Sequence, residues 1–270
     1  FCSPVSHIHE DECNAPEFFS GAKLTLVGDS DKIDPKELKE SIQAEESRGV
    51  HGPQRGPVSI TQITEKGQVY TLNEIKELTQ IAKEFNLPVH MDGARFANAL
   101  VSLECTAAEM TWKAGVDVVS FGGTKNGLMG VEGVIFFDPQ KAWEFELRRK
   151  RAAHLFSKHR YLSAQMLAYL QNDLWIELAG KANKAASRLI AGLRKIEKVE
   201  FLVEPKANLI FVKMPAYMHR NAFAKGLEYY TWSEIDGVSD DTPVVARFIV
   251  DWSRSLRDID KFLEIMRNAA

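Results

Sequence analysis

The sequence has few of the features that mark secreted, membrane-spanning or nucleic-acid-binding proteins. Its 270 residues include only 3 cysteines, an odd and widely spaced set that favours reduced thiols and shows no metal-binding spacing. No apolar run approaches the ~20 residues of a membrane span, and no secretory signal pattern opens the chain. A net charge of -3 gives no reason to expect nucleic acid or a membrane surface as a partner. The sequence therefore predicts a globular cytoplasmic protein without a metal site.

Strand-like and helix-like segments alternate through the first half of the chain. Two helix starts carry capping patterns: Asp34 stands before Pro35 and Glu37, and Thr71 stands three residues before Glu74. The strand-like runs are residues 23–27, 57–62, 87–92, 116–121 and 131–137, and the helices between them cover residues 35–45, 72–85, 94–103 and the capped segment after Thr106. This alternation predicts an α/β fold with a mostly parallel sheet covered by helices.

The pattern changes in the second half. A long helical region begins near residue 139 and continues as helices over residues 162–177 and 181–196. Short strands at residues 199–203, 209–213 and 244–250 then alternate with helices near residues 219–226 and 255–267. We therefore expect a large α/β domain at residues 1–175 and a smaller C-terminal α+β domain at residues 176–270.

Two polar residues follow neighbouring strands of the predicted sheet. Lys125 stands among small residues in the glycine-rich loop after residue 121, and Asp92 ends the strand at residues 87–92. Ligands of parallel sheets bind at the carboxyl ends of strands, and desolvation makes a lysine amine nucleophilic. Pyridoxal phosphate (PLP) needs such a lysine for its Schiff base and a carboxylate for its pyridinium nitrogen. The alternatives are a solvated lysine in an ordinary turn and an aspartate that caps the next helix.

These residues belong to a wider resemblance. The run at residues 90–99, His-Met-Asp-Gly-Ala-Arg-Phe-Ala-Asn-Ala, resembles the signature of low-specificity threonine aldolases, which stand beside the aromatic amino acid β-eliminating lyases. Residues 7–19, 58–62 and 154–165 and the Lys125 loop resemble the same family. The resemblance implies the PLP-dependent transferase-like fold (fold type I), with a large PLP-binding α/β domain and a smaller C-terminal domain. It also implies PLP as cofactor and an amino acid as small-molecule substrate.

The resemblance implies a role for four residues in cofactor binding. Lys125 would form the Schiff base, and Asp92 would bind the ring nitrogen. His7 would stack on the ring face and take part in catalysis beside Lys125. Arg160 would reach a phosphate in the same or a neighbouring subunit.

Two arginines would bind the substrate. Arg95 would contact the substrate carboxylate from the large domain, and Arg247 would do so from the small domain. Bidentate guanidinium contacts would orient the scissile bond. The alternative for Arg95 is a surface ion pair, which contributes under ~1 kcal/mol. Arg247 lies inside an apolar strand, where a charge needs a partner, and this favours a substrate-binding role over a surface ion pair.

The chain departs from the family pattern in two places. Family members carry a preceding N-terminal segment with a phosphate-binding turn at a helix N-terminus, for which this sequence has no counterpart, so we expect that this segment is missing. Some members also place a histidine in the loop after the strand at residues 57–62, near the substrate hydroxyl. Here that loop contains Glu65, and the role passes to Glu65, to His7 or to a water molecule.

The resemblance implies aldol cleavage of β-hydroxy-α-amino acids, with L-threonine or L-allo-threonine giving glycine and acetaldehyde. The alternatives are a PLP-dependent β-eliminating lyase, an amino acid racemase, and an inactive fragment of such an enzyme. The family also implies a homo-oligomer, arranged as a dimer of dimers (a homotetramer). No nucleic acid or membrane partner is expected.

Overall fold

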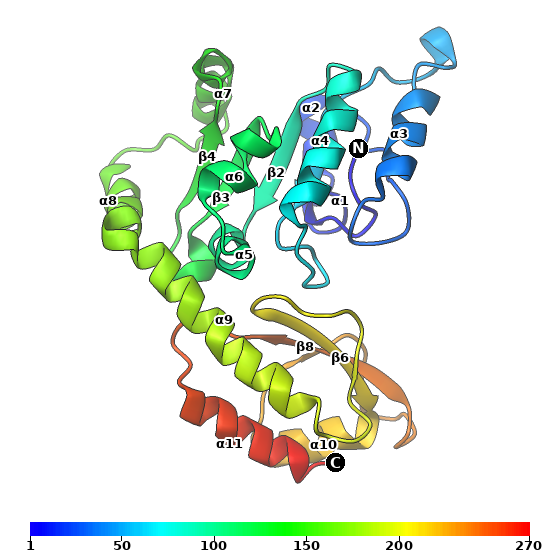
Figure 1. The fold of residues 1–270 in the computed structure, drawn as a ribbon, viewed down its shortest axis with the longest axis vertical. Coiled ribbons are helices and arrows are strands. Elements are labelled where there is room, and N and C mark those ends of the chain that lie inside the picture. Colours follow the sequence, from blue (N-terminus) through cyan, green and yellow to red (C-terminus); the bar gives the residue numbers. More distant parts are fainter. The chain divides into compact units, whose positions relative to one another are not determined.

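The computed structural model describes all residues from Phe1 to Ala270, which form two compact units. The first unit comprises Phe1–Glu65 and Tyr70–Trp175, and the second comprises Lys66–Val69 and Ile176–Ala270. In Figure 1 the first unit runs from blue to green, and residues 176–270 of the second unit run from yellow-green to red. None of the helices combines the length and the apolar character that crossing a membrane requires.

The sheet of the first unit has four strands in the order β1-β2-β3-β4. Their bounds are β1 (Val58–Thr61), β2 (Val89–Gly93), β3 (Val118–Gly122) and β4 (Glu132–Phe136). β1, β2 and β3 run parallel, and β4 is antiparallel to β3. The predicted, mostly parallel sheet is thus confirmed. The strand predicted at residues 23–27 is wrong, because that segment makes only an isolated bridge between Cys2 and Leu26.

Helices cover this sheet and its edges (Figure 1). They are α1 (His7–Glu10), α2 (Ala15–Ser20), α3 (Pro35–Ala44), α4 (Leu72–Glu84), α5 (Phe96–Leu103), α6 (Ala107–Met110), α7 (Pro139–Arg151) and α8 (Arg160–Leu170), with short 3-10 helices η1 (Gly49–His51), η2 (Trp112–Ala114), η3 (Thr124–Asn126) and η4 (Gln171–Asp173). The predicted caps are confirmed: Asp34 accepts from two backbone N–H groups of α3, and Thr71 and Thr106 form capping boxes.

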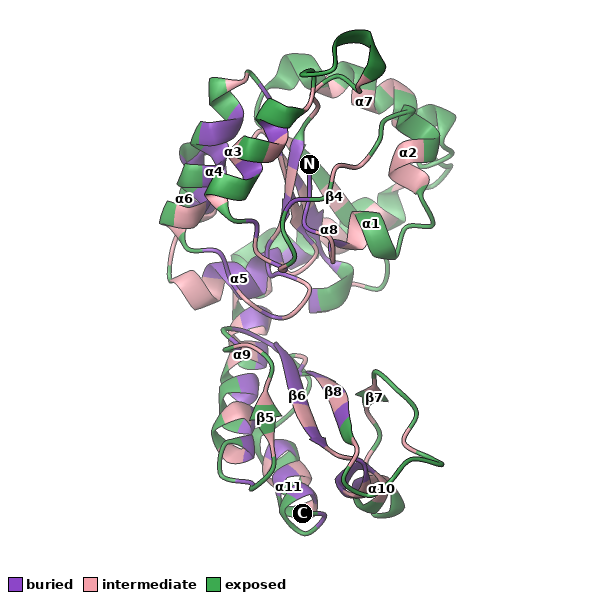
Figure 2. Cartoon of the chain, turned by 90° about the vertical axis from the view of Figure 1, so that its right-hand side faces the viewer, coloured by how far each residue is buried: buried purple, intermediate pink, exposed green.

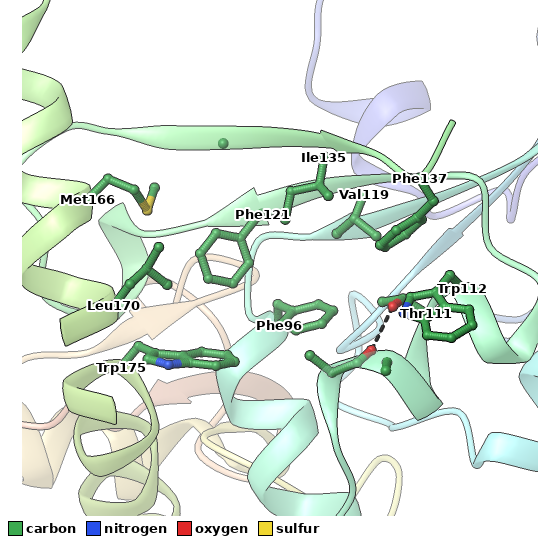
Figure 3. Close-up of a pocket in the computed structure, with 13 residues that line it drawn as sticks. Phe96, Thr111, Trp112, Val119, Phe121, Ile135, Phe137, Met166, Leu170 and Trp175 are labelled. Carbon is green, nitrogen blue, oxygen red and sulfur yellow. Dashed lines mark hydrogen bonds between the residues drawn. The ribbon is translucent and has the colours of Figure 1, made fainter. Parts of the chain in front are cut away.

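The two faces of the sheet differ in polarity. Ser59, His90 and Ser120 lie on one face, where His90 bonds to both serines. The opposite face carries buried apolar residues such as Val119 and Phe121. It opens into an apolar groove of about 370 Å³, where the rings of Phe96, Phe121 and Trp175 pack together (Figure 3). Polar side chains are therefore concentrated on the face away from this groove.

Gly93 allows the end of β2 to approach β3 closely. A Cβ atom built on Gly93 would lie 2.7 Å from the carbonyl oxygen of Ser120 and 3.1 Å from the Cβ of Phe96. We therefore expect Gly93→Ala to lower the free energy of unfolding by about 1–3 kcal/mol, since the clash involves backbone that cannot rotate away. Gly130→Ala is the control, because a Cβ there meets nothing within 4 Å. Equal urea midpoints for both variants would contradict this prediction.

The second unit is an antiparallel sheet covered by helices. The strand order is β5-β6-β8-β7, with β5 (Glu200–Phe201), β6 (Leu209–Pro215), β7 (Tyr230–Thr231) and β8 (Pro243–Ile249). Its core joins these strands to α9 (Leu174–Leu193), α10 (Ala216–Ala224) and α11 (Leu256–Arg267), and the buried side of α9 is purple in Figure 2. The predicted break between helices at residues 178–180 is wrong. The break lies at η4, where Asn172 has φ 54°.

Candidate active site

The Asp92 turn and the Lys125 loop meet at the carboxyl ends of β2 and β3. Asp92 pairs with Ser120 in the parallel register of the two strands, and Lys125 lies in η3, just after β3 ends. Gly122 lies so close to Ala94 that a Cβ on Gly122 would overlap the carbonyl oxygen of Ala94. The backbones of the two segments are therefore in direct contact at the edge where parallel sheets bind ligands.

The loop that carries Lys125 is anchored on both sides of the lysine. The carboxylate of Glu132 accepts hydrogen bonds from the backbone N–H groups of Gly123 (3.2 Å) and Thr124 (3.0 Å). The buried Asn126 side chain donates to the hydroxyl of Tyr169 (2.6 Å) and to the carbonyl oxygen of Trp175 (2.9 Å). Burial raises the pKa of Tyr169 to about 12, so its hydroxyl stays protonated. Lys125 is exposed between these anchors, on a segment held in one conformation.

Asp92 closes the turn that leads from β2 to α5. Its Oδ1 accepts a hydrogen bond from the Ala94 N–H at 2.9 Å. α5 begins at Phe96, two residues later than predicted, and no side chain caps it. The Asp92 carboxylate therefore does not cap the helix. A turn joins Asp92 to Arg95, and Arg95 is half-buried in that turn.

A half-buried histidine, His90, precedes Asp92 by two residues on the same strand and the same face of the sheet. His90 Nδ1 is 2.9 Å from the hydroxyl oxygen of Ser59, and Nε2 is 2.9 Å from that of Ser120. Burial lowers the pKa of His90, and the nearby charge of Asp92 opposes this shift. The imidazole is thus neutral and bonded through both nitrogens. No role for His90 was predicted from the sequence. The available signal was the alternation of His90 and Asp92 with apolar residues along β2.

His7 reaches the same region through Glu65. The backbone N–H of His7 donates to Oε1 of Glu65 (3.1 Å). The hydroxyl of Thr61, at the end of β1, donates to the same oxygen (2.7 Å). Thr61 pairs with Asp92 in the register of β1 and β2. The His7 ring is 44% exposed, and its Nδ1 lies 2.7 Å from Oε1 of Glu12. His7 and Thr61 are thus both bonded to the Glu65 carboxyl group, and Thr61 is the neighbour of Asp92 in the sheet.

The remaining two arginines are described within their own units. Arg160 is exposed at the start of α8, with its guanidinium 5.1 Å from the ring centroid of Tyr161. Arg247 belongs to β8 of the second unit and is half-buried, 4.8 Å from the ring centroid of Tyr230. Their roles in phosphate and substrate binding stay predictions.

Comparison with known proteins decides the family. The model of the beta-eliminating lyase family matches residues 1–216. The chain belongs to the beta-eliminating lyase family. It is similar to the low specificity L-threonine aldolases of a Pseudomonas species (40% identical over 253 residues, 93% of this chain and 70% of the relative) and of Pseudomonas aeruginosa (36% over 269 residues, 99% and 74%). The family predicted from the sequence is thus confirmed.

The fold agrees with this family. The structure of Leishmania major threonine aldolase matches with a TM-score of 0.88 and 24% identity, over 100% of this chain and 77% of that one. The fold is that of the fold-type-I PLP enzymes, and beta-eliminating lyases depend on PLP.

The residues of this chain fit the cofactor. The aldehyde of PLP requires a lysine amine, and its pyridinium nitrogen requires a carboxylate. Lys125 and Asp92 carry these groups on two segments whose backbones are in direct contact. Glu65 beside them keeps a buried oxygen, Oε2, without a hydrogen-bond partner. Since buried polar atoms are normally bonded, a polar ligand is expected at this place.

Proposed function

We propose that this chain cleaves β-hydroxy-α-amino acids, converting L-threonine or L-allo-threonine into glycine and acetaldehyde with PLP as cofactor. One observation carries the proposal: the Asp92 turn and the Lys125 loop meet at the carboxyl edge of the parallel sheet of a beta-eliminating lyase. The similarity to two low specificity L-threonine aldolases supports the choice of substrate.

Four residues hold the cofactor in this proposal. Lys125 binds its aldehyde carbon, and Asp92 keeps the proton on the ring nitrogen. His7 packs on the ring, with its imidazole oriented by Glu12, and Arg160 binds a phosphate. When bound, PLP accepts the electron pair of the bond that breaks at the substrate Cα.

The arginines select which bond at Cα breaks. Arg95 and Arg247 bind the two oxygens of the substrate carboxylate through paired N–H donors. This contact fixes rotation about the bond between Cα and the amine, so that the Cα–Cβ bond is the one aligned for cleavage. Arg95 belongs to the turn between β2 and α5, beside Asp92, which supports its assignment to the same site.

An assay of product formation tests the proposal. The protein loaded with PLP is incubated with L-threonine, L-allo-threonine and phenylserine, and glycine and aldehyde are measured. We expect equal amounts of both products. Deuterium exchange at Cα without aldehyde would instead indicate a racemase or β-eliminating lyase. A chain that binds no cofactor would be an inactive fragment, and both results would contradict the proposed function.

We further propose that the chain acts as a homo-oligomer, a dimer of dimers, in the cytoplasm. Large apolar side chains are exposed between residues 129 and 170, among them Met129 (88%), Trp143 (67%) and Leu167 (70%). α7, in the same region, buries none of its residues, and Figure 2 shows it mainly green and pink. Exposed apolar surface of this kind supports an interface with another subunit. Sedimentation velocity of the loaded protein measures the number of subunits.

A further inference from the structure

Glu65 is a buried carboxyl group beside the proposed active site for which the proposed function provides no role. It follows β1 at the same sheet edge as the Asp92 turn. The inference below rests on the proposed function, because it concerns a proton that only aldol cleavage moves.

The two oxygens of Glu65 have different surroundings. Oε1 accepts hydrogen bonds from the Thr61 hydroxyl (2.7 Å) and from the backbone N–H of His7 (3.1 Å). Oε2 is buried and has no hydrogen-bond partner. A carboxylate oxygen that is desolvated and unbonded is a strong acceptor, because nothing else in its surroundings stabilises its charge. The group is thus held in place through Oε1, while Oε2 keeps an acceptor site that no protein group uses.

The surroundings of Glu65 make its carboxylate easier to protonate than an ordinary glutamate. Burial raises the pKa of Glu65 above its ordinary value of 4.5, and the charge of Asp92 on β2 raises it further. Hydrogen bonds from the Thr61 hydroxyl and from the backbone N–H groups of Glu65 and His7 oppose this rise. The other titratable neighbours are Cys2 and Tyr70, and burial raises the pKa of both, so they stay neutral. A base whose pKa lies closer to the working pH transfers protons more effectively.

The histidines of this region are less suited to the same task. Both ring nitrogens of His90 are bonded to serine hydroxyls. The ring of His7 is half-exposed and is paired with Glu12 and, more distantly, with Asp11. Among these groups, Glu65 alone has a buried acceptor atom without a hydrogen-bond partner.

We propose that Glu65 is the base that accepts the β-hydroxyl proton of the substrate. The proton passes from the hydroxyl oxygen to Oε2, the O–H electrons form the carbonyl bond of the aldehyde, and the Cα–Cβ bond breaks, for which PLP held by Lys125 and Asp92 would supply the electron sink. Cα gains a proton from the amine of Lys125, and water returns the proton of Glu65 to that amine. The sum is one amino acid converted into glycine and one aldehyde, with no proton gained or lost.

Glu65→Gln tests this step with little disturbance of the fold. The amide oxygen of glutamine can still accept the bonds from Thr61 and His7, but the amide cannot take up a proton. We expect kcat for threonine cleavage to fall by roughly 10²–10⁴-fold. The visible absorbance of the lysine-bound cofactor and the exchange of glycine Cα protons with D₂O should persist, because neither requires the β-hydroxyl base.

Thr61→Val provides a second variant that keeps the carboxyl group. Loss of the Thr61 donor raises the pKa of Glu65, since that bond stabilises the charged form. Wild-type kcat should fall as the pH drops through the pKa of Glu65. This acidic limb should shift to higher pH in Thr61→Val and disappear in Glu65→Gln. ¹³C NMR of glutamate-labelled protein, with the Glu65 signal assigned by its absence in Glu65→Gln, measures the same pKa without any activity.

The outcomes separate the two proposals. Threonine cleavage by Glu65→Gln within about threefold of wild type, a Glu65 carboxyl that titrates at or below 4.5, or loss of cofactor absorbance in the variant would each overturn the role of Glu65 and leave the proposed function standing. Failure of the loaded wild-type chain to release aldehyde would overturn the proposed function itself, and the role of Glu65 with it.

Discussion

Lys125→Ala is expected to remove the visible absorbance band of the bound cofactor and to lower threonine cleavage by roughly 10⁴-fold or more, the scale seen when a covalently acting residue is lost. The loop around Lys125 is held by Glu132 and by the buried Asn126, neither of which depends on the lysine side chain. The fold should therefore survive, and the loss is chemical. An absorbance titration with PLP and a glycine assay measure both effects.

Lys113→Ala is the matched control for Lys125. Lys113 is also exposed in the first unit, but its contact is with the ring of Trp112, 5.4 Å from its amine. Because free lysines can react nonspecifically with an aldehyde, a surface lysine must be tested alongside. Lys113→Ala should keep both the band and the activity. A band that survives in Lys125→Ala would place the cofactor on another lysine and contradict the assignment.

Asp92→Asn is expected to lower threonine cleavage by roughly 10²–10³-fold, the cost of losing one charge-stabilising group at a reacting centre. Asparagine keeps an oxygen that can accept the Ala94 N–H bond, so the turn before α5 should be retained. What is lost is the negative charge that keeps the proton on the ring nitrogen. Steady-state kinetics with saturating cofactor measure the activity, and urea unfolding measures the stability.

A helix cap provides the control for Asp92. Asp34 caps α3 through bonds from Lys36 N–H and Glu37 N–H, and it has no part in the proposed site. Asp34→Ala should lower the free energy of unfolding by about 1 kcal/mol and leave kinetics unchanged. If Asp92→Asn behaved in the same way, with reduced stability and normal activity, Asp92 would be a structural residue only.

Local sequence patterns predicted the secondary structure best where side chain and backbone interact within a few residues. The capping boxes at Thr71 and Thr106 and the cap at Asp34 are such cases, because each donor and acceptor lies within three residues. The segment at residues 23–27 failed for the opposite reason. Its backbone meets Cys2 in a single bridge, and weak alternation could not reveal that no strand partner continues beside it.

Some residues of the candidate site could likewise be predicted from local sequence, and others could not. Lys125 and Asp92 could be chosen from the sequence, because each ends a strand-like run and parallel strands place such ends at one edge. Glu65 could be named only as one of three candidates for its role, and His90 received none. Their properties depend on burial and on Thr61, His7 and the two serines, whose contacts cross between strands.

The sequence by itself determined the mostly parallel α/β fold, the family and the cofactor, because strand and helix patterns and the motif around Asp92 are local. Only the tertiary structure decided which groups are held, which are desolvated and which remain open to a ligand. Gly122 lies against Ala94 and so joins the two motifs, and Glu65 is bonded through Oε1 while Oε2 has no hydrogen-bond partner. These differences in hydrogen bonding and desolvation arise when residues far apart in the chain pack together and exclude water. No local stretch of sequence contains that information.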